Sequence, residues 1–407
     1  MSFDINAIRV QFPILQRQVN GCPLHYLDNA ATTFSPNPVL DSVRDFETGF
    51  RANVARGVHR LAAEATDAYE GARASVARYI NAAVPEEVVF TSGTTASMNQ
   101  LAYCLEPRLQ PGDEILVSLA EHHSNFVPWQ MLCKRSGATL RIIPLHTDAT
   151  LDLDAAESLL SQKTRIVAVT HASNVTGEQV AVQRLAQLTR QAGAMLVVDG
   201  AQAVPHGPVD VQALGADFYA FSGHKCYAPT GIGVLWGRNQ LLHELPEFML
   251  GGGMVERVEV AGTRFLEANQ RLEAGTPPIA QAIGLGAAVE WLMTLPWAQI
   301  KEHETQLLQQ LAAGLADIRG FRLIGPALVR PRLPIVSFDI EGCHPHDICQ
   351  MSDQHGVALR GGHHCAQPLM DAMGVMATTR ASFAVFNTKE DVQALLSGLR
   401  QAVEFLQ

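Results

Sequence analysis

The segment RIVAVTHASNVTGEQVAVQRLAQLTRQAGAMLVVDGAQ, residues 165–202, carries the strongest fold signal in the chain. It opens with an apolar, β-branched run, continues with a helix-like stretch near 183–192 and ends in a second apolar run at 194–202. Two buried strands joined by a helix are typical of a βαβ unit, whose strands are parallel. The same alternation extends from about residue 85 to residue 237. The sequence therefore predicts an α/β fold with a mostly parallel sheet covered by helices on both faces.

The pattern changes after about residue 290. A long amphipathic helix and two strands are predicted there, over 298–318, 333–340 and 378–386. These elements are typical of a smaller α+β domain at the C-terminal end. We expect a large domain at 24–290, and a small domain made of 1–23 together with 291–407.

The bulk composition excludes several classes of partner. The chain has 407 residues and a formal net charge of −10, whereas nucleic acids and anionic membranes attract a basic surface. The first residues are polar and acidic where a signal peptide would be basic and then apolar, and no apolar run reaches the ~18 residues of a membrane span. The seven cysteines show no CxxC spacing and no disulfide framework. We expect a cytoplasmic protein that binds neither nucleic acid nor membrane.

Two strand ends carry residues suited to one cofactor. Lys225 follows the apolar run at 217–222, and Asp199 ends the strand in VVDGAQ. Alone, Lys225 could simply reach solvent and Asp199 could be a cap or a structural acid. Together they match pyridoxal 5′-phosphate (PLP), which needs a lysine for covalent attachment and a carboxylate beside its ring nitrogen. Gln202 could then bind the phenolic oxygen of the ring.

A phosphate site is predicted in TSGTTAS, residues 91–97, where a strand ends and a helix begins. Backbone amides and hydroxyl groups at a helix N-terminus bind anions, although such a turn alone is more often a simple cap. With the lysine and the aspartate present, Thr94 and Thr95 are candidates for the phosphate, and Ser222 and His224 would complete the site. His122, after another strand, could stack on the pyridine ring.

The stretch RGGHHCAQPL, residues 360–369, contains the remaining candidate, Cys365. Adjacent His-His-Cys side chains cannot easily reach one ion, and structural zinc sites favour other spacings, so we expect no metal. A purely structural cysteine is the second alternative. The nucleophile is the interpretation that fits best, because neighbouring histidines and Arg360 would favour the thiolate.

These motifs together resemble the class V aminotransferase family. Within this family they resemble the cysteine desulfurases of the SufS/CsdA type, which are the group II desulfurases and are similar to selenocysteine lyases. The resemblance extends over nearly the whole chain, in the motifs YLDNAATT, GTT, EHHSN, THASNVTG, VDGAQ, FSGHK, EAGTP, HHCAQP and RASFAVFNT. It implies a fold-type I PLP enzyme that acts as a homodimer. It also implies conversion of L-cysteine to L-alanine, with the sulfur held on Cys365 as a persulfide. Delivery to a SufE- or CsdE-like acceptor for iron–sulfur clusters or other sulfur metabolism, and activity on L-selenocysteine, are implied as well. The alternative is another class V enzyme: an epimerase, a kynureninase-like hydrolase or a transaminase.

The resemblance also assigns roles to individual residues. Lys225 and Cys365 would be catalytic, and His122 would both stack on the ring and assist acid–base steps. The cofactor would be bound by Thr94, Thr95, His122, Asp199, Gln202, Ser222, His224 and Lys225, with Thr276 reaching the phosphate of the other subunit. The substrate carboxylate would be bound by Asn174, Arg360 and Arg380. The chain departs from the family pattern at Ala55, where a histidine is usual, and at Ser92, Cys226 and Ala228.

Overall fold

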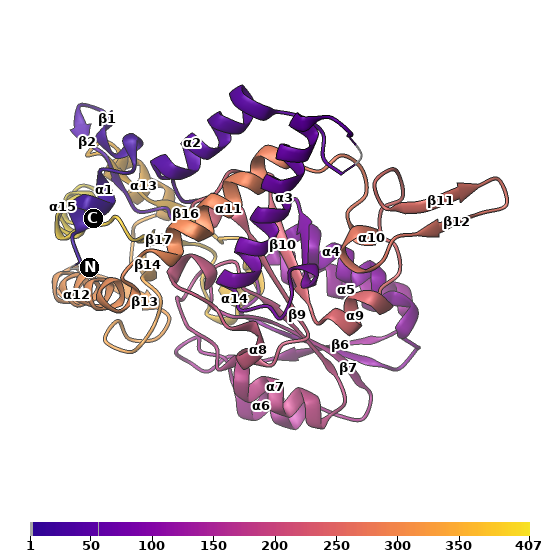
Figure 1. The fold of residues 1–407 in the computed structure, drawn as a ribbon. Coiled ribbons are helices and arrows are strands. Elements are labelled where there is room, and N and C mark those ends of the chain that lie inside the picture. Colours follow the sequence, from indigo (N-terminus) through magenta and orange to yellow (C-terminus); the bar gives the residue numbers. More distant parts are fainter. Residues whose placement is uncertain (1–2, 56) are drawn as a thin grey trace.

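The larger sheet contains seven strands and confirms the predicted α/β architecture (Figure 1). The structure is a computed structural model that describes residues 3–55 and 57–407. The strands are β4 (Val88–Thr91), β5 (Glu114–Ser118), β6 (Thr139–Ile143), β7 (Thr164–Thr170), β8 (Met195–Asp199), β9 (Phe218–Ser222) and β10 (Gly233–Gly237). Their order is β4-β10-β9-β8-β7-β5-β6. The five strands from β5 to β9 are mutually parallel. Only β10 departs from this direction, because it runs antiparallel to both β4 and β9.

Both faces of this sheet are buried, because successive side chains on a strand point to opposite faces. On β7, Val167 and Val169 belong to one hydrophobic cluster, and Ile166 and Ala168 belong to another. The first cluster includes residues of α2 (Asn37–Asp45), α3 (Arg60–Tyr79), α7 (Val182–Gln191) and α11 (Ile279–Met293). The second includes residues of α4 (Thr94–Cys104), α5 (Val127–Ser136), α9 (Asn239–Glu244) and α10 (Ala268–Leu272). This double cover explains why the strands are continuously apolar in sequence.

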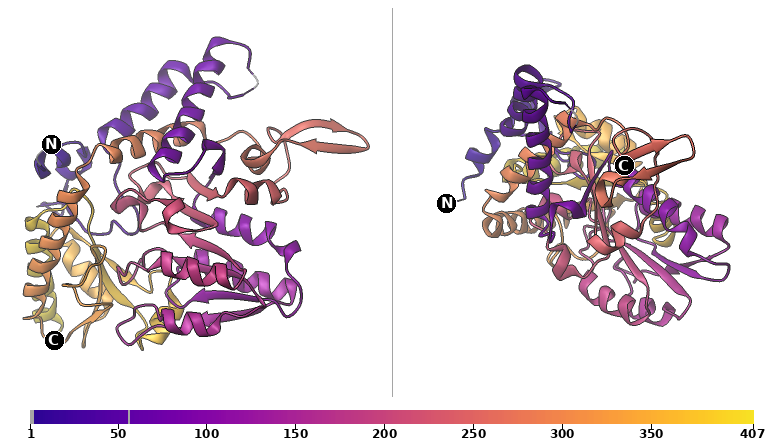
Figure 2. Two further views of the ribbon diagram at one scale, coloured as in Figure 1. Left: turned by 60° about the horizontal axis from the view of Figure 1, so that its bottom comes forward. Right: turned by 45° about the vertical axis from the view of Figure 1, so that its right-hand side comes forward.

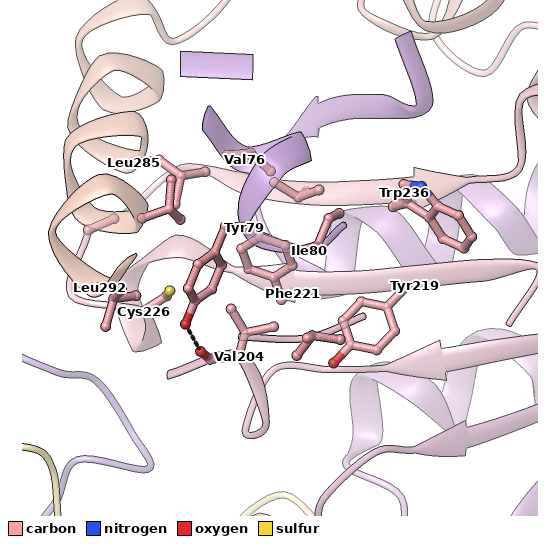
Figure 3. Packing of buried hydrophobic residues seen from close by; sticks show 14 of the residues in the cluster. Val76, Tyr79, Ile80, Val204, Tyr219, Phe221, Cys226, Trp236, Leu285 and Leu292 are labelled. Carbon is pink, nitrogen blue, oxygen red and sulfur yellow. Dashed lines mark hydrogen bonds between the residues drawn. The ribbon is translucent and has the colours of Figure 1, made fainter. Parts of the chain in front are cut away.

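The core on the α3 and α11 side contains Cys226, one of the departures from the family pattern (Figure 3). Tyr79 donates a hydrogen bond from its hydroxyl group to the Val204 carbonyl oxygen at 2.8 Å, so its polar end is satisfied inside the core. Cys226 is fully buried, and burial raises the pKa of its thiol well above the usual range. Although it follows Lys225 in sequence, Cys226 is therefore a small core residue and not a reactive thiol.

The second sheet has four antiparallel strands in the order β13-β14-β17-β16. They are β13 (Phe321–Ile324), β14 (Ile335–Ile340), β17 (Thr378–Ser382) and β16 (Arg360–Gly362). Helices α12 (Trp297–Leu315), α13 (Pro345–Asp353) and α15 (Lys389–Leu406) share a hydrophobic cluster with this sheet. The predicted α+β unit is thereby confirmed, and the short helix α14 (Gln367–Ala372) follows β16.

The N-terminal segment lies beside this second sheet, on the side where both termini are found (Figures 1 and 2). Its helix α1 (Ile5–Arg9) is fixed by Arg9, whose Nη1 donates to the Phe386 carbonyl oxygen at 2.6 Å. Strand β3 (His25–Tyr26) pairs in parallel with β15 (Val357–Ala358). The domain boundaries expected from the sequence remain a prediction.

A two-stranded hairpin projects from the body of the molecule (Figures 1 and 2). It consists of β11 (Val255–Glu259) and β12 (Gly262–Phe265), and Val258 and Val260 on it are exposed. The remaining short α-helices and strands are α6 (Leu153–Leu159), α8 (Val211–Leu214), β1 (Gln18–Val19) and β2 (Cys22–Pro23). Within the described ranges, no single helix is long and apolar enough to cross a membrane. The consecutive helices α11 and α12 reach the required length and hydropathy only when they are taken together, and the angle between them is 84°.

Candidate active site

A cavity of about 250 Å³ lies at the carboxyl ends of β7, β8 and β9, between the two sheets. Ligands of parallel α/β sheets bind at this edge, because the loops that follow the strands converge there. The cavity brings together nearly all residues predicted from the sequence. Its lining includes Thr94, Thr95, His122, Asn174, Asp199, Gln202, Ser222, His224, Lys225, Arg360, Cys365 and Arg380.

Lys225 and Asp199 form an opposed pair of charges in this cavity. Lys225 lies in the short helical turn directly after β9, and Asp199 is the last residue of β8. Burial lowers the pKa of Lys225 to about 8, against an opposing effect of the Asp199 charge. Burial raises the pKa of Asp199, while the Ala201 amide, which donates to Oδ1 at 2.9 Å, and the Lys225 charge oppose the shift. A neutral lysine amine is thus accessible near physiological pH, as nucleophilic chemistry requires.

His122 and Gln202 line the same cavity. Burial lowers the pKa of His122 to about 3, with Lys225 contributing in the same direction, so the ring is neutral at physiological pH. The Ser124 amide donates to Nδ1 at 3.1 Å, which leaves the ring proton on Nε2. Gln202 donates from Nε2 to the Ala30 carbonyl oxygen at 2.8 Å, which fixes its side chain at the cavity wall.

The N-terminus of α4 forms a cradle beside Ser222. The backbone amide of Thr94 donates to Ser222 Oγ at 2.9 Å, and the two hydroxyl groups are also 2.9 Å apart. Gly93 has a φ of +145°, which disfavours any side chain, and a Cβ on Gly233 would lie 2.4 Å from the Gly93 Cα atom. The glycines therefore keep this cradle open at the start of an 11-residue helix, where an anion is favoured.

The opposite wall is cationic and comes from the small sheet. Arg380 on β17 is buried, and Arg360 on β16 is its direct partner across the two strands. Arg380 Nη1 donates to the Asn174 carbonyl oxygen at 3.0 Å. Two guanidinium groups at one end of a cavity suit a carboxylate, which accepts paired hydrogen bonds from such groups.

Asp28 is a charged residue next to the cavity that the sequence did not single out, although it lies in the motif YLDNAATT. Its carboxylate binds Arg360 Nη2 at 2.9 Å and Arg380 Nη2 at 3.2 Å. No local signal in the sequence connects it to these arginines, because they lie more than 300 residues away. Only the pairing of the N-terminal segment with the small sheet reveals the contact.

Cys365 sits on a turn with an unusual backbone. Both His364 and Cys365 have positive φ, +51° and +54°, a left-handed conformation that costs non-glycine residues about 1–2 kcal/mol each. The turn is held because the His123 amide donates to the Cys365 carbonyl oxygen at 2.7 Å and Asn174 Nδ2 donates to that of His364 at 2.8 Å. Cys365 itself is exposed at the cavity mouth. The role of His123 in holding this turn was also missed, since its neighbour His122 looked like the functional residue.

Of the predicted site residues, Thr276 does not line this cavity. Thr276 is exposed and lines a separate cavity of about 440 Å³ together with Ala55. The expected contact of Thr276 with the other subunit's phosphate remains a prediction. In the part of the chain that the structure describes, no cluster of three or more His, Cys, Asp or Glu side chains is placed to hold a metal ion.

The donors around the cavity fit PLP. An amine with a lowered pKa suits an aldehyde, the buried carboxylate of Asp199 suits a protonated ring nitrogen, and a neutral imidazole suits the face of an aromatic ring. The open cradle at Gly93 suits a phosphate. These groups come from separate segments, yet all face one cavity.

The fold and this site define a PLP-dependent enzyme of the class V aminotransferases. Residues 25–395 match that family, and the chain belongs to it. Similar proteins within the family include cysteine desulfurases, the class predicted from the sequence. A probable cysteine desulfurase of Vibrio cholerae is 45% identical over 407 residues, covering 100% of both chains. A cysteine desulfurase of Salmonella agona is 46% identical over 401 residues, or 98% of each chain.

Solved structures agree with this assignment. The cysteine desulfurase CsdA of Escherichia coli, in an S-sulfonic acid form, has a TM-score of 0.93 at 41% identity. The apo cysteine desulfurase of Thermococcus onnurineus has a TM-score of 0.94 at 38% identity. Both alignments cover 100% of each chain. The predicted family, fold and PLP cofactor are confirmed.

Proposed function

We propose that this chain is a PLP-dependent cysteine desulfurase that converts L-cysteine to L-alanine and takes up the sulfur on Cys365. The observation that carries the proposal is that one cavity is lined by Lys225, by Arg360 and Arg380, and by the exposed thiol of Cys365. A transaminase has no need for a thiol at this place. When bound, PLP supplies an electron sink for the substrate α-carbon.

The large sheet provides the groups that would hold the cofactor. Lys225 Nζ would attach it covalently, Asp199 would bind the ring nitrogen, Gln202 the phenolic oxygen, and His122 one face of the ring. The phosphate would be bound by Thr94, Thr95, Ser222 and His224, with Thr276 contributed by a second copy of the chain. Their common position at the cavity supports this assignment for all except Thr276.

The small sheet provides the groups for the substrate. Arg360, Arg380 and Asn174 would bind the α-carboxylate and so fix the orientation of L-cysteine. Lys225 Nζ would remove the α-proton of the bound substrate. Its lowered pKa suits a base that works near neutral pH.

Cys365 would then act as the nucleophile. Its thiolate attacks the sulfur of the substrate, a sulfur–sulfur bond forms and the carbon–sulfur bond of the substrate breaks. The carbon skeleton gains a proton and leaves as L-alanine, while Cys365 becomes a persulfide. The net change is L-cysteine plus a thiol to L-alanine plus a persulfide, which balances. L-selenocysteine would be accepted as well, since selenium in it occupies the position of sulfur.

The exposed position of Cys365 supports delivery of the persulfide to a SufE- or CsdE-like acceptor protein for iron–sulfur clusters or other sulfur uses. A homodimer is supported by the projecting hairpin with its exposed valines and by the position of Thr276 away from the cavity. The seven unpaired thiols support a reducing, cytoplasmic location. The separate seven-stranded and four-stranded sheets support a division into a large and a small domain, for which we keep the boundaries 24–290 and 1–23 with 291–407.

The test compares Cys365→Ala with Cys22→Ala, a second unpaired thiol that does not line the cavity. Cys365→Ala should keep the visible absorbance of the cofactor and still bind L-cysteine, but should form no L-alanine from it. Cys22→Ala should behave like the wild type. Full turnover of L-cysteine by Cys365→Ala would refute the role of this thiol.

The acceptor is tested separately. Basal release of L-alanine should be slow and should rise when a SufE- or CsdE-like protein is added, with sulfur appearing on that protein. An unchanged rate with every such protein would refute this part of the proposal while leaving the desulfurase activity intact.

A further inference from the structure

The two arginines of the cavity form a like-charge pair within a sheet. In the antiparallel pairing of β16 with β17, Arg360 is directly opposite Arg380. Like charges at directly opposed positions destabilise a sheet. Arg380 is moreover almost fully buried, and burial lowers its pKa to about 10. Such a pair requires a counter-charge nearby.

Asp28 supplies that charge from a third segment of the chain. Its backbone position is fixed by β15, which lies just before the strand of Arg360 in sequence, and by β17, the strand of Arg380. The Leu27 amide donates to the Ala358 carbonyl oxygen at 3.0 Å, and the Ser382 amide donates to the Leu27 carbonyl oxygen at 2.7 Å. The carboxylate is thereby placed between the two guanidinium groups.

The contacts of this carboxylate are specific in geometry. Two nitrogens of Arg360 donate to this carboxylate. Nε lies 3.0 Å from Oδ1 and 3.1 Å from Oδ2, and Nη2 lies 2.9 Å from Oδ2. Arg380 approaches the other oxygen, with Nη2 3.2 Å from Oδ1. Only 14% of the Asp28 side chain and 3% of the Arg380 side chain are exposed, so solvent screens the pair formed by these two residues weakly.

We propose that Asp28 is a positioning residue that orients Arg360 and Arg380 for the α-carboxylate of the substrate. The inference rests on the proposed function and deepens it. One carboxylate against two guanidinium groups leaves one positive charge, which a substrate carboxylate neutralises. Arg380 Nε is buried and has no hydrogen-bond partner among the described residues, so part of this arginine is still unsatisfied by the protein.

The same arginine links this unit to the thiol. Arg380 Nη1 donates to the Asn174 carbonyl oxygen, and Asn174 Nδ2 donates to the carbonyl oxygen of His364, the residue before Cys365. Asp28 is therefore connected, through Arg380 and Asn174, to the turn that carries Cys365.

The experiment uses the full-length, PLP-loaded protein and two ligands that differ only in a carboxylate, L-alanine and ethylamine. Binding of each is measured by equilibrium dialysis for the wild type, Asp28→Asn and a control, Asp154→Asn. Asp154 also pairs with an arginine, Arg184, but lies on the surface outside the cavity. Thermal unfolding and cofactor absorbance check that each variant is folded and loaded.

Asp28→Asn should weaken L-alanine binding about tenfold to a hundredfold and leave ethylamine binding unchanged, because only the carboxylate contact is lost. In steady-state assays, KM for L-cysteine should rise by a similar factor while kcat changes less than about threefold. Asp154→Asn should match the wild type throughout. If Asp28→Asn does not fold, Asp28→Ser, which is smaller and also uncharged, is used in its place.

Three results would overturn the proposal. Equal losses for L-alanine and ethylamine would mean a general structural role. Unchanged L-alanine binding would mean that the arginines need no counter-ion, and tighter binding would mean that Asp28 competes with the substrate. If the wild type formed no L-alanine from L-cysteine, the proposed function would fail, but the dialysis comparison would still decide the role of Asp28.

Discussion

The two halves of the cavity solve the problem of buried charge differently. On the large sheet, one cation, Lys225, is opposed by one anion, Asp199, at the ends of parallel strands. On the small sheet, two cations, Arg360 and Arg380, share one anion, Asp28, across antiparallel strands. The first half is balanced, whereas the second retains a positive charge.

This difference indicates how each half is used. A balanced half suits a group that stays bound and is held by a covalent bond, a ring contact and a phosphate cradle. A half with surplus positive charge suits an anion that enters and leaves in every cycle. Changes in the first half should therefore reduce cofactor loading or kcat, and changes in the second should raise KM.

The largest effect is expected for Lys225→Ala. Loss of the amine removes both the covalent attachment and the base, so formation of L-alanine should fall at least about 10³-fold. Cofactor retained after gel filtration should fall too, which absorbance measures. The control is Lys163→Ala, an exposed lysine outside the cavity. Near-normal turnover by Lys225→Ala would contradict the assignment of the large-sheet half of the cavity to the cofactor.

The next effect is expected for Asp199→Asn, which removes the negative charge beside the ring nitrogen while keeping the size of the side chain. The rate kcat should fall about 100-fold and KM should change little, because the electron sink is weakened but the arginines are untouched. Steady-state kinetics with L-cysteine measure both constants. A variant with normal kcat and raised KM would reverse the assignment of the two halves.

A smaller effect is expected for Arg380→Gln, which removes one of the two positive charges from the small-sheet half of the cavity. KM for L-cysteine should rise about tenfold to a hundredfold, while cofactor content stays that of the wild type. Arg330→Gln, which breaks an exposed ion pair with Asp148, is the matched control and should show no change. Loss of cofactor from Arg380→Gln would show that the halves are not independent.

The smallest effect concerns pH. Because burial lowers the pKa of Lys225 to about 8, its amine is protonated below this value and neutral above it. The rate at which cofactor-free protein takes up PLP should therefore rise about tenfold per pH unit up to pH 8 and then level off. Asp199 raises this pKa, so Asp199→Asn should shift the profile to lower pH. Stopped-flow absorbance measures the profile, and a rise that continues beyond pH 10 would contradict a lowered pKa.

The half of the cavity on the large sheet, which is proposed to bind the cofactor, was largely predictable because each of its residues is marked by the sequence next to it. Each strand end is marked by an apolar run followed by a polar residue, as at Asp199 and Lys225, and parallel strands bring such ends to one edge. Glycine before a helix likewise marked the cradle at Thr94. The antiparallel direction of β10 was not specified, since a buried strand reads the same in either direction.

The half of the cavity on the small sheet, which is proposed to bind the substrate, was not predictable in this way. The local sequence singled out Cys365, the carboxylate-binding roles of Arg360 and Arg380 came from the family resemblance, and Asp28 was missed. Its role depends on a register that brings three distant segments side by side, and no periodicity reports such a contact. The left-handed backbone at Cys365 was also unforeseen, because it is imposed by hydrogen bonds from His123 and Asn174.

The contact between Asp28 and its arginines has a consequence for the synthesis of the protein. Asp28 is made early, whereas its partners follow 332 and 352 residues later. At about 5–20 residues per second, a ribosome needs roughly 17–66 s to reach the first of them. Lys225 and Asp199 lie only 26 positions apart (225 − 199). A chain released before residue 360 would contain every residue proposed to hold the cofactor, but neither of the arginines that Asp28 binds.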